Sequence, residues 1–89
     1  MARFEAPLPD GSSFAPTGGS PDAFYQLGLM YAAGREVPLD LVTAHKWLNI
    51  AASRGNFDAR RMRSELALEM TRAEIMEAQR QARAWVTVH

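Results

Sequence analysis

The sequence predicts a small all-α domain, and three observations support this fold class. Apolar residues recur at spacings of three and four along four segments, which is the period of an amphipathic helix. A residue that caps helix amides precedes each segment. No run alternates apolar and polar residues for long enough to form a strand. We therefore expect two antiparallel helical hairpins, with helices over about residues 21–34, 40–54, 57–69 and 72–86, in a short α-solenoid-like arrangement.

The first predicted helix, over residues 21–34, has signals at both ends. Ser20 can cap the free amides, Pro21 suits the first position because it has no N–H to satisfy, and Asp22 complements the positive end. Gly34 ends the helix because glycine adopts the left-handed conformation of a helix end at little cost. The face that we expect to be buried carries Ala23, Leu27, Met30 and Tyr31.

The second predicted helix, over residues 40–54, follows a loop in which Pro38 cannot continue a helix. Asp40 can cap its start and Gly55 marks its end. We expect His45 to be a partly exposed surface residue, because no second ligand lies at a metal-binding spacing. The expected buried face carries Leu41, Ala44, Trp47, Leu48, Ala51 and Ala52.

Capping signals also mark the remaining two helices. Asn56 precedes the helix over residues 57–69, and Thr71 with Glu74 forms a capping box at the start of the helix over residues 72–86. Residues 86–89 are expected to fray. The expected buried residues are Ala59, Met62, Leu66 and Met70 in the third helix and Ile75, Ala78, Ala82 and Trp85 in the fourth.

Residues 1–20 differ from the rest of the chain because proline, glycine and serine dominate them. This composition buries too little apolar surface to offset the entropy of ordering. We predict a flexible arm over residues 1–20, followed by a helical domain over residues 21–89. Phe4, Leu8 and Phe14 are the large apolar residues of this arm, and they can dock on the domain or on a partner.

Length and composition exclude several classes of protein. The chain has 89 residues and no cysteine, which is too short for a Rossmann or TIM-barrel enzyme and excludes disulfides and thiolate metal sites. Ten basic and ten acidic residues cancel, so no net charge attracts nucleic acid or an anionic membrane. No apolar run of about 20 residues is present in the sequence, and residues 1–7 contain no apolar stretch typical of a secretory signal. We therefore expect no signal peptide and a cytoplasmic location.

The residues also provide no recognisable catalytic or cofactor-binding set. Ser53, Ser64 and Thr71 lie at predicted helix surfaces or caps, with no base and acid arranged around them. No glycine-rich loop with a nearby lysine follows a strand to bind phosphate. We therefore expect a protein that is not an enzyme and that binds no cofactor and no metal.

Small, large and loop residues follow a fixed order over residues 23–59, at Ala23, Leu27, Gly28, Tyr31, Gly34, Asp40, Ala44, Trp47, Ala51, Ala52, Gly55 and Ala59. This order resembles the Sel-one-like repeat family, a relative of the tetratricopeptide repeat. Small residues at these positions let two helices approach closely, and large ones fill the space between them. Glu36 stands where the family pattern has a second loop glycine. If that position needs positive φ, Glu36 carries about 1 kcal/mol of strain. The next repeat matches weakly, so residues 57–86 resemble an altered closing pair.

The resemblance implies a non-catalytic adaptor or scaffold that binds a protein or peptide. We expect the partner to lie in the groove of the first and third helices, in contact with Phe24, Leu29, Arg60 and Arg63. One alternative is self-association, in which a second copy completes the core of a short repeat. A weaker alternative is nucleic-acid binding by a patch of arginines, which the neutral net charge of the chain argues against. The arginines of this patch are Arg54, Arg60, Arg61 and Arg63.

Overall fold

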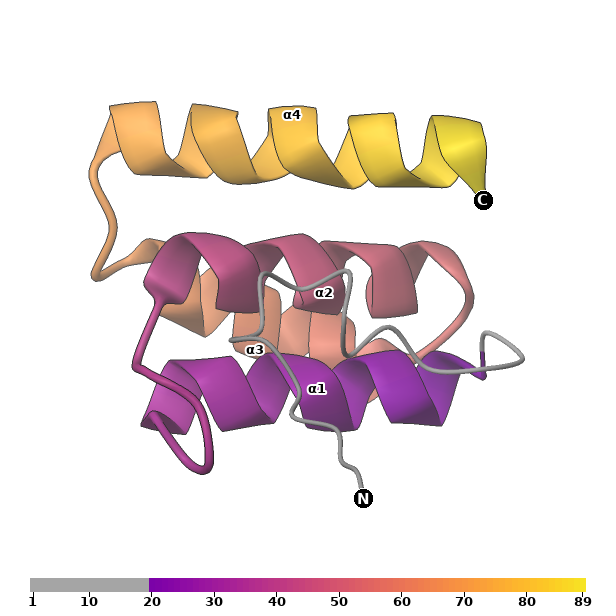
Figure 1. The fold of residues 1–89 in the computed structure, drawn as a ribbon, viewed down its shortest axis with the longest axis horizontal. Helices are drawn as coiled ribbons and strands as arrows, with labels where there is room; N and C mark the ends of the chain where they lie inside the picture. The colour runs from indigo at the N-terminus through magenta and orange to yellow at the C-terminus, as the bar shows by residue number, and fades with distance from the viewer. Residues whose placement is uncertain (1–19) are drawn as a thin grey trace, which may run out of the picture.

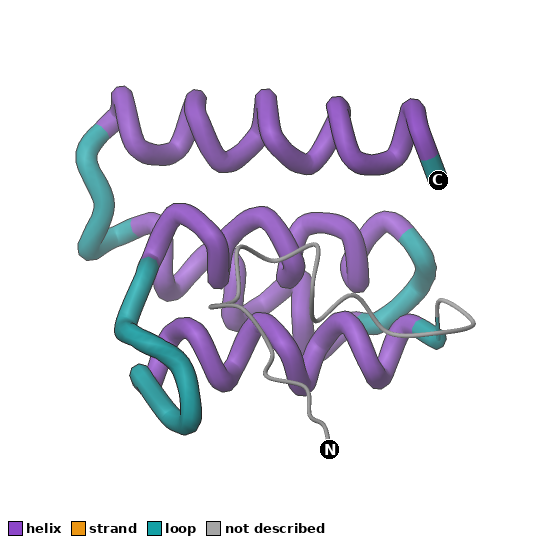
Figure 2. The backbone as a smooth tube through the Cα atoms, in the orientation of Figure 1, coloured by secondary structure: helices purple, strands orange, loops and turns teal. Residues whose placement is uncertain are grey.

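The computed structural model describes residues 20–89, so the predicted arm lies outside the described residues except for Ser20. Within this range the chain forms four helices and no strand: α1 (Pro21–Ala33), α2 (Leu41–Ser53), α3 (Phe57–Ala67) and α4 (Arg72–Val88). Short loops join them, and their directions alternate, so that α1 and α3 run opposite to α2 and α4 (Figures 1 and 2). The all-α prediction is confirmed. No helix in this part of the chain is both long and apolar enough to cross a membrane.

The predicted helix starts are confirmed by hydrogen bonds to the capping side chains. Asp40 Oδ1 accepts from the Thr43 amide at 3.1 Å, and Asn56 Oδ1 accepts from the Ala59 amide at 2.7 Å. Ser20 caps α1, and the capping box of α4 has both of its hydrogen bonds. Each cap satisfies helix amides that have no partner inside the helix, which is why short-range sequence signals place these starts.

The loop between α1 and α2 contains two residues in the left-handed region. Gly34 ends α1 with φ 68°, as predicted, and Glu36 has φ 69°. Glu36 therefore has the backbone conformation that favours the glycine of the repeat pattern. The buried side chain of Val37 fixes the loop directly after this residue.

Close packing between α1 and α2 depends on Gly28. A Cβ atom on this residue would lie 2.7 Å from Leu48 Cδ2 and 3.3 Å from the carbonyl oxygen of Ala44. Real carbon atoms do not approach a Cβ to less than 3 Å, so a larger residue at position 28 must displace its neighbours. The prediction that small residues bring these helices together is therefore confirmed at Gly28.

An aromatic cluster connects α1, α2 and α4. The Phe24 ring stacks on Trp47 with a centroid distance of 5.7 Å. Trp85 presents its edge to both rings, with a centroid distance of 5.3 Å to each. Tyr31 and Trp47 are buried, which confirms the prediction that they belong to the core.

Helix α2 is the central element, because α1, α3 and α4 each pack against it. We predicted two hairpins whose helices pack on each other, and the second pair differs from this prediction. Helices α3 and α4 run antiparallel, but α2 contacts each of them more extensively than they contact one another. The physical reason is Trp85, whose side chain packs into the cluster of Phe24 and Trp47 and thereby holds α4 over α2. Helix α4 continues to Val88, beyond the predicted end at residue 86.

Candidate partner-binding groove

The structure overturns the prediction that Phe24 is an exposed partner contact. Its side chain is 0% exposed, because it is enclosed by Trp47 and Trp85. In the sequence, Phe24 lies at the edge of the expected buried face of α1, next to Ala23. In the structure, α4 covers this edge through Trp85. Phe24 instead packs against Trp85 of the fourth helix.

The other three predicted contacts lie in different environments. Leu29 is half-buried on α1, and Arg60 is exposed on α3. Arg63 is half-buried and donates a hydrogen bond from Nη1 to Asn49 Oδ1 on α2 at 2.6 Å. Arg63 therefore lies beside Asn49, whereas Phe24 is enclosed in the aromatic cluster, so the structure does not unite the two residues in one groove.

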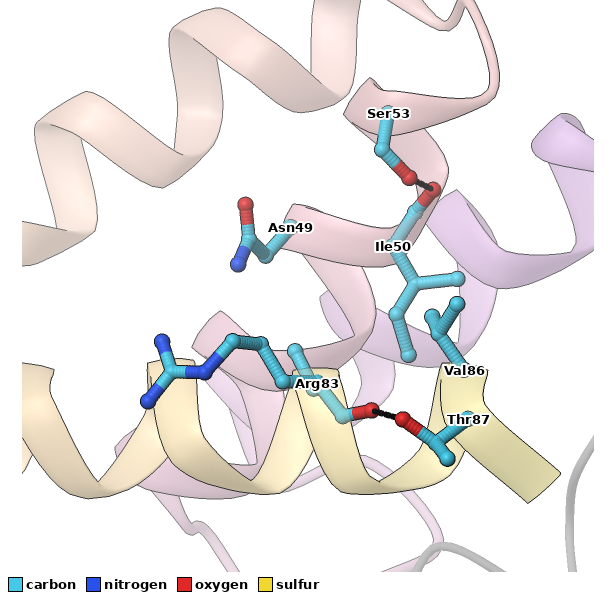
Figure 3. Close-up of a pocket in the computed structure, with 7 residues that line it drawn as sticks. Asn49, Ile50, Ser53, Arg83, Val86 and Thr87 are labelled. Carbon is cyan, nitrogen blue, oxygen red and sulfur yellow. Dashed lines mark hydrogen bonds between the residues drawn. The ribbon is translucent and has the colours of Figure 1, made fainter.

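A cavity of about 370 Å³ lies between α2 and α4 (Figure 3). Two hydroxyl groups in its wall are turned to their own helices: Ser53 donates to the Ile50 carbonyl at 2.7 Å, and Thr87 donates to the Arg83 carbonyl at 2.8 Å. The wall near these residues is therefore mostly carbon. We call this cavity the α2/α4 groove, and its lining residues are Asn49, Ile50, Ser53, Ala82, Arg83, Val86 and Thr87.

The polar groups of the α2/α4 groove gather at one end. Asn49 Oδ1 accepts the hydrogen bond from Arg63, so the amide nitrogen of Asn49 is turned toward the side of Arg83 (Figure 3). Within residues 20–89, neither this amide nitrogen nor the Arg83 guanidinium has a hydrogen-bond or ion-pair partner. No acidic residue lines the groove. This end therefore presents hydrogen-bond donors and positive charge beside an apolar wall.

Neighbouring arginines are already engaged in other contacts. Arg80 and Glu77 form an ion pair at 2.6 Å, and hydrogen bonds from Arg80 and Gln81 lower the pKa of Glu77 to about 2. The expected patch of four arginines is divided in the same way. Arg61 pairs with Asp58 and Arg63 bonds to Asn49, whereas Arg54 lies over the rings of Phe24 and Trp85.

His45 is buried at 3% exposure, so the prediction of a partly exposed residue is wrong. Burial lowers the pKa of His45, and the positive charge of Arg63 lowers it further. Its Nδ1 atom has no hydrogen-bond partner among the described residues. Burial on the flank of α2 was not predictable, because the period of α2 alone does not show that other elements cover both of its sides.

Sequence reasoning missed most of the groove. Asn49 interrupts an otherwise apolar stretch of α2, and Arg83 and Val86 lie one turn apart beside the small residue Ala82. These signals are visible in the sequence, but each has an ordinary explanation as helix surface until α4 is placed over α2. Within residues 20–89, no group of three histidine, aspartate or glutamate side chains is arranged to hold a metal ion.

Comparisons with known proteins provide no relative for this chain: no family model, no curated protein and no solved structure matches it.

Proposed function

We propose that this protein is a non-catalytic interaction module, an adaptor or scaffold, whose contact surface is the α2/α4 groove. The single observation that carries the proposal is the groove itself, a cavity of about 370 Å³ with a mostly apolar wall and uncommitted donors at one end. Binding sites in proteins are commonly concave and apolar, with a few polar groups that fix orientation, and this volume falls in their usual range of about 300–1,000 Å³. We place the partner here and not between α1 and α3, because Phe24 is unavailable there.

The Sel-one-like resemblance remains part of this proposal. The left-handed conformation of Glu36 and the close approach of Leu48 to Gly28 agree with the roles that the repeat pattern gives to these positions. In this altered repeat α3 and α4 pack on α2 more than on each other, so part of the α2 surface stays accessible beside α4. An accessible surface of this kind suits a short adaptor.

Site-specific photo-crosslinking in the producing cells tests the proposal. A photoreactive amino acid at Val86, which is 45% exposed and lines the groove, should form a discrete adduct with one protein. The control position is Leu68, which is 86% exposed and does not line the groove. Adducts from both positions alike, or from neither, would show that the groove is not the contact surface.

A further inference from the structure

We infer that the α2/α4 groove binds an acidic protein segment, one that presents an aliphatic side chain next to an aspartate or glutamate. This inference rests on the proposed function and specifies the partner of the same site. Charge complementarity carries it: Arg83 is the one charged residue that lines the groove, and no carboxylate among the lining residues neutralises it.

The polar end of the groove is arranged for a carboxylate. Arg63 fixes the Asn49 amide by donating to its oxygen at 2.6 Å, which leaves the two N–H groups of Asn49 free to donate. The Arg83 guanidinium lies on the side of the groove toward which these N–H groups point (Figure 3). Both groups only donate in this arrangement, so an anionic oxygen satisfies them together, whereas a lysine or arginine of a partner would be repelled.

The apolar end of the groove accounts for the aliphatic neighbour. Ile50 and Ala82 are almost fully buried at its floor, and Val86 forms an exposed edge. Ser53 and Thr87 add carbon to the wall because their hydroxyl groups donate to their own helices. A branched apolar side chain on this surface and a carboxylate at the donors beside it would use both ends of the groove at once.

Asn49→Asp is the most informative variant. Aspartate has nearly the same shape as asparagine and still accepts the hydrogen bond from Arg63, so α2 and α3 keep their contact. The same change replaces the two donors in the groove by a negative oxygen. The inference therefore predicts loss of binding without loss of folding, which circular dichroism and urea unfolding measure on the same samples.

The test begins with random peptides displayed inside a carrier loop, so that both peptide ends are blocked, and uses the full chain as bait. Enriched peptides should share an aliphatic residue within two positions of aspartate or glutamate. One such peptide, synthesised with blocked ends, should bind Asn49→Asp and Arg83→Gln at least about 10-fold more weakly than the parent. Arg72→Gln removes the same charge elsewhere on α4, outside the groove, and should leave the affinity unchanged.

Other outcomes separate this inference from the proposed function. If Val86→Glu removes peptide binding but Asn49→Asp and Arg83→Gln do not, the groove is the contact surface and an acidic partner is wrong. If no peptide is enriched, or if Val86→Glu also binds normally, the inference and the proposed function both fail. A dimer in sedimentation that Val86→Glu dissociates would identify a second copy as the occupant and overturn the inference.

Discussion

Replacing Glu36 by glycine should stabilise the domain, although glycine usually weakens an ordered loop. Glu36 is exposed and has φ 69°, a conformation that costs a residue with a Cβ about 1–2 kcal/mol. Glycine removes this strain, but the greater freedom of the unfolded chain costs about 0.4–1 kcal/mol. The net expectation for Glu36→Gly is a gain between about 0 and 1.6 kcal/mol in the free energy of unfolding, centred on about 0.8 kcal/mol, or several degrees in Tm for a domain of this size.

Urea unfolding followed by far-ultraviolet circular dichroism measures this gain, and two variants serve as matched controls. Arg35 is the exposed neighbour of Glu36 and does not have positive φ. Arg35→Gly therefore adds only unfolded-state freedom and should lower stability by about 0.4–1 kcal/mol. Glu36→Ala removes the carboxylate but keeps the strained backbone, so its stability should stay within about 0.5 kcal/mol of the parent.

The signs of these changes decide whether the reasoning holds. Equal destabilisation by Glu36→Gly and Arg35→Gly would show that residue 36 carries no backbone strain. Equal stabilisation by Glu36→Gly and Glu36→Ala would show that the lost charge, and not the backbone, is responsible.

Three further predictions concern the core, a buried histidine and a helix cap. Gly28→Leu should lower the free energy of unfolding by about 1–3 kcal/mol, because its Cβ would lie 2.7 Å from Leu48 Cδ2; an unchanged urea midpoint would contradict the close contact. The pKa of His45 is lowered in the folded state, so the unfolded chain binds the proton more tightly. Stability should therefore fall as pH drops below about 6.5, by at most about 1.4 kcal/mol per pH unit, and His45→Gln should reduce this slope in urea titrations at several pH values. Thr71→Ala removes the acceptor for the Glu74 amide and should cost about 0.5–2 kcal/mol by thermal unfolding; a normal Tm would mean that the cap contributes nothing.

Features that depend on neighbours along the chain were predictable. Asp40, Asn56 and Thr71 each bond to an amide three residues further on, so a short stretch of sequence contains both partners. The same holds for Gly34, whose left-handed conformation ends α1. These signals placed the helix starts and the first helix end with little reference to the rest of the molecule.

Features that depend on which helix covers a flank were not predictable. Helical periodicity placed Phe24 beside the packing face of α1 and His45 beside that of α2, but it does not show what lies next to either flank. The structure covers both residues, and this burial removed Phe24 from the set of accessible partner contacts.

The sequence by itself determined the four helices and their caps, because hydrogen bonds and steric limits within a few residues decide these features. Only the tertiary structure decided where α4 lies. Trp85 packs with Phe24 and Trp47, residues far from it in sequence, and this nonlocal contact places α4 on α2. The α2/α4 groove and its donors, Asn49 and Arg83, exist because of that placement.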